Sequence, residues 1–339
     1  MHNTDYDYAG IEVSMKELVV GIERQGASRQ VVTRRFKNTA SGHRKLVQFL
    51  LCRGRITRVV AEYTGVYSID VALALCGIEG IELMQANPRS VRDFARAMLR
   101  RSKSDKVDTL VLVEYVRAMP FRPFVPPSPT ACELRSMSRE IKSLIKQATR
   151  EKNRLHATSH DSTASKLVLK VHKKMILQIE KLIADLEKAA LKLIQGEPEL
   201  QRKYDLLVTV KGIAARSAIQ ILGEIACIPA DLDPHQLTAL AGLDPVHSTS
   251  GQSVHKKKGI SKQGNKNLRE AFYMPAMAAI RTQPNVRAFY MKLLARGKLK
   301  IVAIVAVMRK LLHSVWGMLT NDQPFDGAKF YFIPDTSAA

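Results

Sequence analysis

The segment from Thr130 to Gln195 constrains the fold more than any other part of the chain, because it contains neither proline nor glycine. Two apolar series run through it in alternating steps of three and four residues, which places each series along one face of a helix. The series are Leu134, Met137, Ile141, Leu144 and Ala148, with Leu155 one heptad further, and Ile176, Ile179, Ile183, Leu186, Ala190 and Leu193. Small polar residues at 157–165 separate them and predict a loop. We therefore predict an antiparallel helical hairpin or coiled coil, packed either on itself or on a second subunit.

A proline-rich stretch marks the clearest boundary in the chain. Residues 123–129 read PFVPPSP, and four prolines in seven residues form a stiff linker that cannot continue a helix. A mixed α/β part precedes this linker, and a mainly helical part follows the hairpin. We therefore predict a first domain at 1–124, a linker and coiled coil at 125–197, a helical domain at 198–330 and a tail at 331–339.

The first part alternates short β-branched runs with helical patterns. Turn-prone residues separate the first three runs, which predicts strands joined by hairpins. The expected strands are 8–13, 17–22, 31–37, 57–62 and 81–86, and the expected helices are 41–51, 67–76, 91–99 and 106–117. In such a hairpin-first mixed sheet, we expect the first and fourth strands to lie side by side at the centre.

Four carboxylates stand where this sheet could use them for chemistry. Glu12 ends the first strand, Glu62 ends the fourth, and Asp105 and Asp108 lie three residues apart on one helical face. Clustered carboxylates repel one another unless a cation holds them, and hard oxygen ligands suit Mg²⁺ or Mn²⁺. One interpretation is a metal site for phosphodiester chemistry. The other is a set of surface carboxylates, with Asp105 as the N-cap of its helix.

The third part begins near Pro198 and contains two features that suit a phosphate. At 206–225 a helix, a turn at Lys211-Gly212 and a second helix resemble a helix-hairpin-helix, whose turn offers backbone N–H groups to a phosphate. Residues 246–269 form a loop without a single acidic residue. The cations of this loop are Lys256, Lys257, Lys258, Lys262, Lys266 and Arg269. Two more apolar helices are expected after it, up to about Leu319.

The basic loop also contains Ser250, which Gly251 follows. A glycine lets a large substrate come close to the backbone, and neighbouring cations favour a phosphate and a developing negative charge. A serine in this setting acts as a nucleophile toward phosphorus, provided that another group takes its proton, or it serves as a phosphate contact. The residues alone leave both roles open.

The charge of the whole chain predicts a polyanionic partner. Its 53 lysines and arginines against 31 acidic residues give a net charge of +22, which in a globular composition points most often to nucleic acid. Its four cysteines lie far apart without a CxxC pair, which argues against a zinc ribbon or a disulfide framework. The longest uninterrupted apolar candidate, 301–308, is far shorter than the roughly 18 residues of a membrane span, and the polar, acidic N-terminus is unlike a signal peptide. We therefore expect a cytoplasmic protein without a membrane partner.

Nine short segments, in order along nearly the whole chain, resemble the DEDD transposases of bacterial insertion sequences, a family that includes the bridge-RNA-guided DNA recombinases. They are YAGIEVS (8–14), AEYTGVY (61–67), NPRSVRDFA (87–95), SKSDKVDTLVL (102–112), LLVTVKGIA (206–214), LAGLDPVHSTSGQS (240–253), ISKQGNKNLREAFYMPA (260–276), MRKL (308–311) and PFD (324–326). Each segment is weak by itself, whereas their ordered combination is highly specific.

The resemblance implies a RuvC-like (RNase H-fold) α/β N-terminal domain, a coiled coil and a mainly α C-terminal transposase domain. The family's four acidic positions fall on Glu12, Glu62, Asp105 and Asp108, which would hold Mg²⁺ or Mn²⁺, and its catalytic serine falls on Ser250. The family usually has Asp at the first of these positions, where this chain has Glu12. The longer side chain can still reach a metal, or the change is an inactivating one.

The resemblance also implies a reaction and its partners. Ser250 would attack a DNA phosphodiester and form a 5′-phosphoserine link, while the acidic site of a second subunit would activate it. The partners would be the element's donor DNA, the target DNA and a noncoding bridge RNA that selects both by base pairing. The protein would act as a dimer, or as a tetramer when active, in the bacterial cytoplasm at the nucleoid.

Two other functions fit the same residues. The first is a RuvC-type metal nuclease that cuts branched DNA by water attack, with Ser250 as a phosphate contact. The second is an RNA- or DNA-binding scaffold whose acidic site has decayed, which Glu12 would explain.

Overall fold

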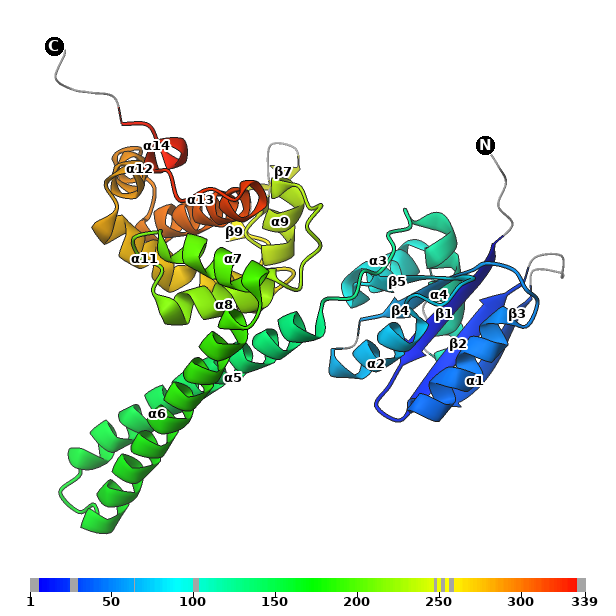
Figure 1. Ribbon diagram of the computed structural model, residues 1–339, viewed down its shortest axis with the longest axis horizontal. Coiled ribbons are helices and arrows are strands. Elements are labelled where there is room, and N and C mark those ends of the chain that lie inside the picture. Colours follow the sequence, from blue (N-terminus) through cyan, green and yellow to red (C-terminus); the bar gives the residue numbers. More distant parts are fainter. Residues whose placement is uncertain are drawn as a thin grey trace. The chain divides into compact units, whose positions relative to one another are not determined.

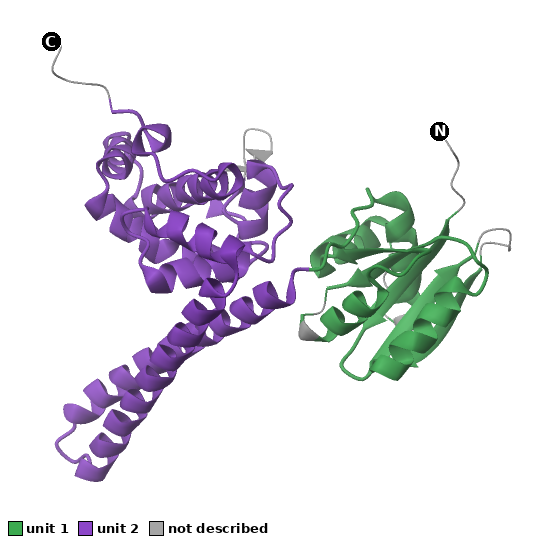
Figure 2. Ribbon diagram, in the orientation of Figure 1, with its two compact units in different colours: residues 1–126 green, residues 127–339 purple. Residues whose placement is uncertain are grey.

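The chain forms two compact units in a computed structural model, residues 1–126 and 127–339 (Figure 2). The structure describes residues 6–24, 30–63, 65–99, 104–246, 249–250, 254–255 and 259–333. At 66, 105, 106, 249, 250, 254 and 255 it describes the backbone alone. The division between the units falls inside the proline-rich stretch, and the finer division at 124, 197 and 330 stays a prediction.

The first unit is a mixed α/β domain (Figure 1). Its strands are β1 (Asp7–Val13), β2 (Glu17–Glu23), β3 (Val31–Lys37), β4 (Thr57–Glu62) and β5 (Ile81–Ala86). Its helices are α1 (Ala40–Leu51), α2 (Val66–Leu75), α3 (Pro88–Ala97) and α4 (Asp105–Ala118). The strand order is β3-β2-β1-β4-β5, with β1 parallel to β4 and antiparallel to β2. The prediction that the first and fourth strands are central neighbours is confirmed.

Helices cover both faces of this sheet. On one face Ile11, Val20 and Val59 pack with Leu46 and Leu50 of α1. On the other face alternate strand residues such as Val60 and Met84 pack with Leu112 and Tyr115 of α4. Both faces are buried because apolar residues occupy both sets of alternating positions along these strands. The arrangement is compatible with the RNase H-like fold that the sequence predicted.

The second unit is mainly helical (Figure 1). Its helices are α5 (Pro129–Ser159), α6 (Lys166–Gln195), α7 (Pro198–Val208), α8 (Ala215–Ile225), α9 (Pro234–Ala241), α10 (Lys266–Ala271), α11 (Tyr273–Thr282), α12 (Pro284–Ala295), α13 (Lys300–Asn321) and α14 (Gly327–Phe330). Between α9 and α10 the described residues include four two-residue strands, namely β6 (Pro245–Val246), β7 (Thr249–Ser250), β8 (Val254–His255) and β9 (Gly259–Ile260).

Helices α5 and α6 form a long hairpin in which they pack on each other. Members of both predicted apolar series are buried there, namely Leu134, Ile141, Leu144 and Ala148 of α5 and Ile176, Ile183 and Ala190 of α6. The base of the hairpin shares one core with α8, α10, α11 and α13. Coiled-coil geometry stays a prediction. The predicted loop at 157–165 begins three residues too early, because no proline or glycine stops α5 before its C-cap His160.

The C-terminal region differs from the sequence prediction in two places. The basic loop ends at Asn265, whose side chain caps α10 by accepting from the N–H groups of Asn267 and Leu268. Three helices follow α10 before residue 321, where the sequence predicted two apolar helices after the loop. The extra break arises because Pro284 starts a new helix at α12.

Helix α13 is long and apolar enough to cross a membrane, which the sequence analysis overlooked by counting only the uninterrupted run at 301–308. Half of its most apolar window is buried inside the protein. Buried residues such as Val307, Leu311 and Val315 belong to the core of the second unit. The apolar composition of α13 is therefore explained by its packing in the core of the second unit.

Candidate functional site

The first two predicted carboxylates lie at the same end of the two central strands. In the parallel ladder of β1 and β4, Ile11 pairs with Ala61. Glu12 and Glu62 are the next residues on each strand. Because side chains alternate along a strand and neighbours in register point the same way, both carboxylates stand on one face of the sheet.

That face is the one that α4 covers. A Cβ atom at Gly10 would lie 2.4 Å from the Cβ of Leu112, and one at Gly21 would lie 2.9 Å from the Cβ of Thr109. The helix therefore approaches these two strands closer than a larger residue would permit. Because Gly10 and Glu12 are two residues apart, Glu12 points to the α4 side as well.

The direction of α4 brings its first turn to the carboxylate end of the sheet. At its C-terminal end, Arg117 forms an ion pair with Glu23 and lies 5.5 Å from the ring centroid of Tyr8. Tyr8 and Glu23 face each other near the start of β1. The helix thus runs opposite to β1, and its N-terminal turn lies over the end of β1 that carries Glu12.

The last two predicted carboxylates occupy that N-terminal turn. The N-cap of α4 is Ser104, whose hydroxyl accepts from the N–H of Val107 at 3.3 Å. Asp105 is therefore the first helical residue, and its alternative assignment as the N-cap is wrong. Asp108 is half-buried one turn further, while the side chain of Asp105 lies outside the described residues.

The donor set at this end of the sheet suits a hard divalent cation. Glu12, Glu62 and Asp108 are all half-buried, and the Oε2 atom of Glu12 is itself buried. Among the side chains that the structure describes, no three histidine, cysteine or acidic groups gather closely enough to hold a metal. The backbone places Glu12, Glu62 and the first turn of α4 toward the same end of the sheet, and the chemistry of these acids, oxygen donors alone, fits Mg²⁺ or Mn²⁺.

Ser250 lies in a separate feature of the second unit, an arm of short strands that we call the serine arm (245–260). At its base β6 pairs with β9, and further out β7, which contains Ser250, pairs with β8. The backbone of Ser250 is described and its side chain is not. Residues 247–248, 251–253 and 256–258 lie outside the described part of the chain, and so do the predicted cations Lys256, Lys257 and Lys258.

The base of the serine arm is fixed by close backbone contacts. Gly242 adopts a left-handed conformation, and a Cβ atom there would lie 2.0 Å from the carbonyl oxygen of Gln263. The N–H of Lys262 donates to the carbonyl of Gly242 at 3.1 Å, and the N–H of Ser261 donates to that of Asp244 at 2.9 Å. The two ends of the arm are therefore held side by side.

Two family models match the chain across both of these features. One, an IS110-type DEDD transposase model, matches residues 9–159, and the other, described as a transposase of the IS116/IS110/IS902 family, matches residues 204–291. The chain belongs to the IS110 family of DEDD transposases. This transposase is therefore an enzyme that acts on DNA, and its four predicted acids and Ser250 all lie inside the matched regions.

Curated relatives of this transposase agree with that assignment. The pilin gene-inverting protein of Moraxella bovis is 29% identical over 241 residues, which cover 71% of this chain and 73% of that protein. A 42 kDa protein of insertion element IS900 from Mycobacterium paratuberculosis is 33% identical over 104 residues, or 31% of this chain and 25% of that protein.

The remaining predicted nucleic-acid contacts of the transposase have different surroundings. Lys262 and Lys266 are exposed, whereas Arg269 donates from Nη1 to the carbonyl of Ala241 at 2.8 Å and so braces the base of the serine arm. Lys211 is exposed in the turn between α7 and α8. Gly212 packs against α11, since a Cβ atom there would lie 2.7 Å from the backbone nitrogen of Ala279. A phosphate contact at this turn stays a prediction.

The sequence analysis of the transposase missed one residue, Glu224 of α8. Its carboxylate is 2% exposed and accepts two hydrogen bonds from Arg139 of α5, at 2.7 and 2.9 Å. It also accepts from the side chain of Asn265, at 2.7 Å, where the serine arm joins α10. Glu224 thus ties the hairpin to the N-cap of α10, a few residues beyond the serine arm. Its signal in the sequence was an acid within the otherwise apolar run ILGEIACI.

Proposed function

We propose that this transposase is a serine recombinase that exchanges DNA strands through a 5′-phosphoserine intermediate, with Glu12, Glu62, Asp105 and Asp108 as a Mg²⁺- or Mn²⁺-binding acidic site. The observation that carries the proposal is the direction of α4. Because α4 runs opposite to β1, its first turn, with Asp105 and Asp108, lies toward the strand ends that carry Glu12 and Glu62, which supports an acidic site there. The names of the pilin gene-inverting relatives point to the same class of strand exchange.

In the proposed reaction the Oγ atom of Ser250 forms a bond to the DNA phosphorus, and the bond from phosphorus to the 3′ oxygen of the neighbouring nucleotide breaks. The serine proton passes to a carboxylate of the acidic site, and the released 3′ oxygen takes up a proton. A bound divalent cation would supply charge stabilisation of the phosphoryl oxygens. Cations next to the serine arm, such as Lys262, would hold the phosphates nearby.

The carboxylates and the serine belong to different compact units. We propose that the acidic site acts on Ser250 of a second subunit, in a dimer that pairs into a tetramer when active, with the α5–α6 hairpin as a dimerising coiled coil. Donor and target DNA would be chosen by an element-encoded bridge RNA, so that the protein itself reads mainly backbone charge. The net charge of +22 supports this mode of binding.

A covalent adduct tests the serine hypothesis. We expect the full-length protein to form a protein–DNA adduct with Mg²⁺ that survives denaturation, and we expect Ser250→Ala to lose the adduct and strand exchange while DNA binding remains. Ser253→Ala, which removes a neighbouring hydroxyl of the same arm, is the matched control. Strand exchange that persists in Ser250→Ala would refute the proposal and favour water attack at the acidic site.

RNA guidance needs its own test. We expect a structured noncoding RNA to copurify with the protein when the element's flanking DNA is coexpressed, with loops complementary to donor and target. Reprogramming one loop should redirect exchange to the matching DNA. Strand exchange that does not depend on the RNA sequence would refute RNA guidance, and it would not affect the serine mechanism.

A further inference from the structure

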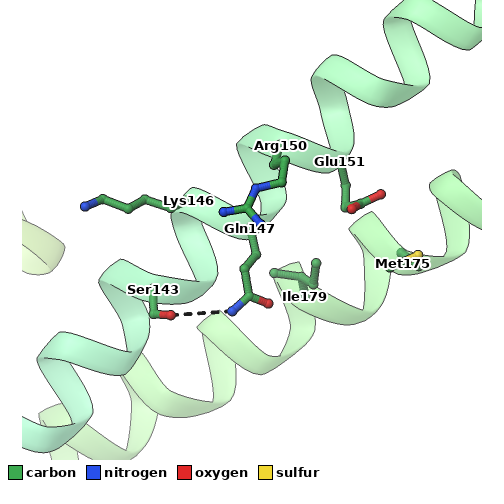
Figure 3. A pocket seen from close by; sticks show the side chains of 7 residues that line it. All are labelled: Ser143, Lys146, Gln147, Arg150, Glu151, Met175 and Ile179. Carbon is green, nitrogen blue, oxygen red and sulfur yellow. Dashed lines mark hydrogen bonds between the residues drawn. The ribbon is translucent and has the colours of Figure 1, made fainter.

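The helical hairpin contains a cavity that neither the acidic site nor the serine arm accounts for. It has a volume of about 310 Å³ and lies between α5 and α6 (Figure 3). Its lining residues are Ser143, Lys146, Gln147, Arg150 and Glu151 of α5 and Met175 and Ile179 of α6. This volume is at the lower end of the range for small-molecule sites, which suits one small ligand or one unit of a polymer.

The α5 wall of the cavity offers hydrogen-bond donors. Arg150 is exposed and forms no hydrogen bond or ion pair with any residue that the structure describes. In Figure 3 the amide of Gln147 is turned toward Ser143 and away from the guanidinium group of Arg150. That amide donates to the hydroxyl of Ser143 over 3.4 Å, a long bond that a better acceptor would replace at little cost. The α5 wall therefore offers a guanidinium group, an amide and a hydroxyl to a ligand that accepts hydrogen bonds.

The charge next to this wall is positive in excess. Glu270 of α10 lies 2.6 Å from the ammonium group of Lys142, 3.4 Å from that of Lys146 and 3.7 Å from that of Lys266. One carboxylate thus serves three lysines. Lys146 reaches away from the α6 wall in Figure 3, which leaves Arg150 as the cation of the cavity itself. The surplus favours an anionic ligand over a neutral one.

The acid in the lining does not cancel this charge. Glu151 accepts from Arg154 at 2.8 Å and from His172 at 2.9 Å, and its carboxylate points away from Arg150 (Figure 3). The hydrogen bond with His172, reinforced by Arg154, holds the pKa of Glu151 below its usual value. Both oxygens of its carboxylate therefore already have partners, and Arg154 supplies the opposite charge.

The α6 wall is apolar. Met175 is 43% exposed and Ile179 is half-buried, so the cavity floor lacks hydrogen-bond donors and acceptors from this helix. A bare phosphate would leave this surface in contact with water. A nucleotide would use both walls, because its phosphate is an acceptor and its sugar and base have apolar faces.

We propose that this cavity binds one nucleotide of a nucleic-acid strand, with the phosphate at Arg150, Gln147 and Ser143 and the sugar or base against Met175 and Ile179. The proposal rests on the proposed function only in taking nucleic acid as the partner. DNA and RNA share the phosphodiester chemistry that the α5 wall recognises, and the experiment below distinguishes them.

The salt dependence of binding tests the phosphate contact. For Arg150→Ala in the full chain, we expect affinity for the bound nucleic acid to fall about tenfold at about 0.1 M salt. The slope of log affinity against log salt should become shallower by about 0.9 if the strand belongs to a DNA duplex, or by about 0.7 if it is single-stranded RNA. Lys188→Ala removes one charge from an exposed position of α6 outside the cavity and should leave the slope unchanged. Equal changes of the salt slope in both variants would show that the loss of one net charge explains the effect, and would overturn the proposal.

The place of contact is tested by chemical protection. In Met175→Cys the new thiol should react with N-ethylmaleimide at least several-fold more slowly when the DNA duplex or the RNA is bound, as read by peptide mass spectrometry. Leu182→Cys, on the same helix at 51% exposure and outside the cavity, should react at an unchanged rate. Protection at Met175→Cys that appears on raising protein concentration alone would show that a second copy covers the cavity, and would overturn the proposal.

The failure of this inference is distinguishable from that of the proposed function. If only the inference fails, Arg150→Ala keeps the wild-type salt slope while the covalent adduct at Ser250 still forms. If only the proposed function fails, the adduct is absent while the salt slope and the protection at Met175→Cys respond as expected.

Discussion

The acidic site and the serine arm are held in place by opposite means. Glu12 and Glu62 extend from the central parallel ladder of a buried sheet, and α4 packs so closely above them that Gly10 has no room for a side chain. Ser250 lies on a two-residue strand outside the helical core, and the contacts that the structure describes between its arm and the rest of the unit are at the base of the arm. Displacing the acids therefore requires disturbing the domain, whereas the described contacts that hold the serine arm are a few hydrogen bonds at and near its base.

The largest expected effect is on the rate of DNA cleavage when a carboxylate of the acidic site is removed. Under the proposed function, Glu62→Gln should lower the rate of DNA cleavage by about a thousand-fold, because a metal ligand contributes several kcal/mol to transition-state charge stabilisation. Glu82→Gln is the control, since it removes a carboxylate from the adjacent strand β5 that pairs with Arg58 at 2.8 Å. Comparable losses in both variants would show that the sheet, and not a metal site, is affected.

Loss of Glu224 should separate the serine arm from its support. Glu224→Ala removes the buried partner of Arg139 and leaves the amide of Asn265 without its acceptor, which costs about 2 kcal/mol in the free energy of unfolding. Adduct formation at Ser250 should fall even at temperatures where the protein remains folded, because the bond to Asn265, a few residues beyond the arm, is lost. Urea unfolding and adduct yield measure the two effects. Glu187→Ala, which removes an ion pair with the half-exposed Arg216, should cost less than about 1 kcal/mol.

A methyl group added between β1 and α4 should disturb the acidic residues only by displacing the helix from the sheet. In Gly10→Ala the new methyl group meets Leu112, and overpacking of this kind costs about 1–3 kcal/mol. Gly259→Ala adds the same methyl group to the serine arm, where no atom of the described residues beyond its chain neighbours lies within 4 Å, and should be nearly neutral. Thermal unfolding compares the two. Equal stability of both variants would contradict the close packing of α4 on the sheet.

The smallest expected effect concerns pH in the second unit. Burial, with help from Arg309 and His235, lowers the pKa of His313, whose Nε2 lies 2.5 Å from the hydroxyl of Thr238. As the pH falls below about 6.5, the unfolded chain takes up a proton before the folded one does, so that stability decreases. His313→Gln should flatten this loss between pH 7.5 and 5.5 in thermal unfolding. Burial also lowers the pKa of His43 in the first unit, so His43→Gln should flatten a separate part of the same loss.

Most of the local structure was predictable from the sequence, because short-range signals decide it. Alternating β-branched runs gave all five strands of the first unit, and the apolar series with steps of three and four gave both hairpin helices. The failures were also local in origin. The start of a new helix at Pro284 was not predicted, and the interrupted apolar pattern around Arg309 and Lys310 hid the length of α13.

By itself, the sequence determined the element order of the first unit, the chemical identity of its four acids and, through its ordered motifs, the family. It could not assign Ser104 rather than Asp105 as the cap of α4, nor place that helix against Gly10. It also could not show that Glu224 joins Arg139 to Asn265. The contacts join residues that are 41 to 102 positions apart in the chain, and the cap depends on the residue at which the helix begins. The packing of the whole unit decides these features, because side chains must fill the interior without overlap.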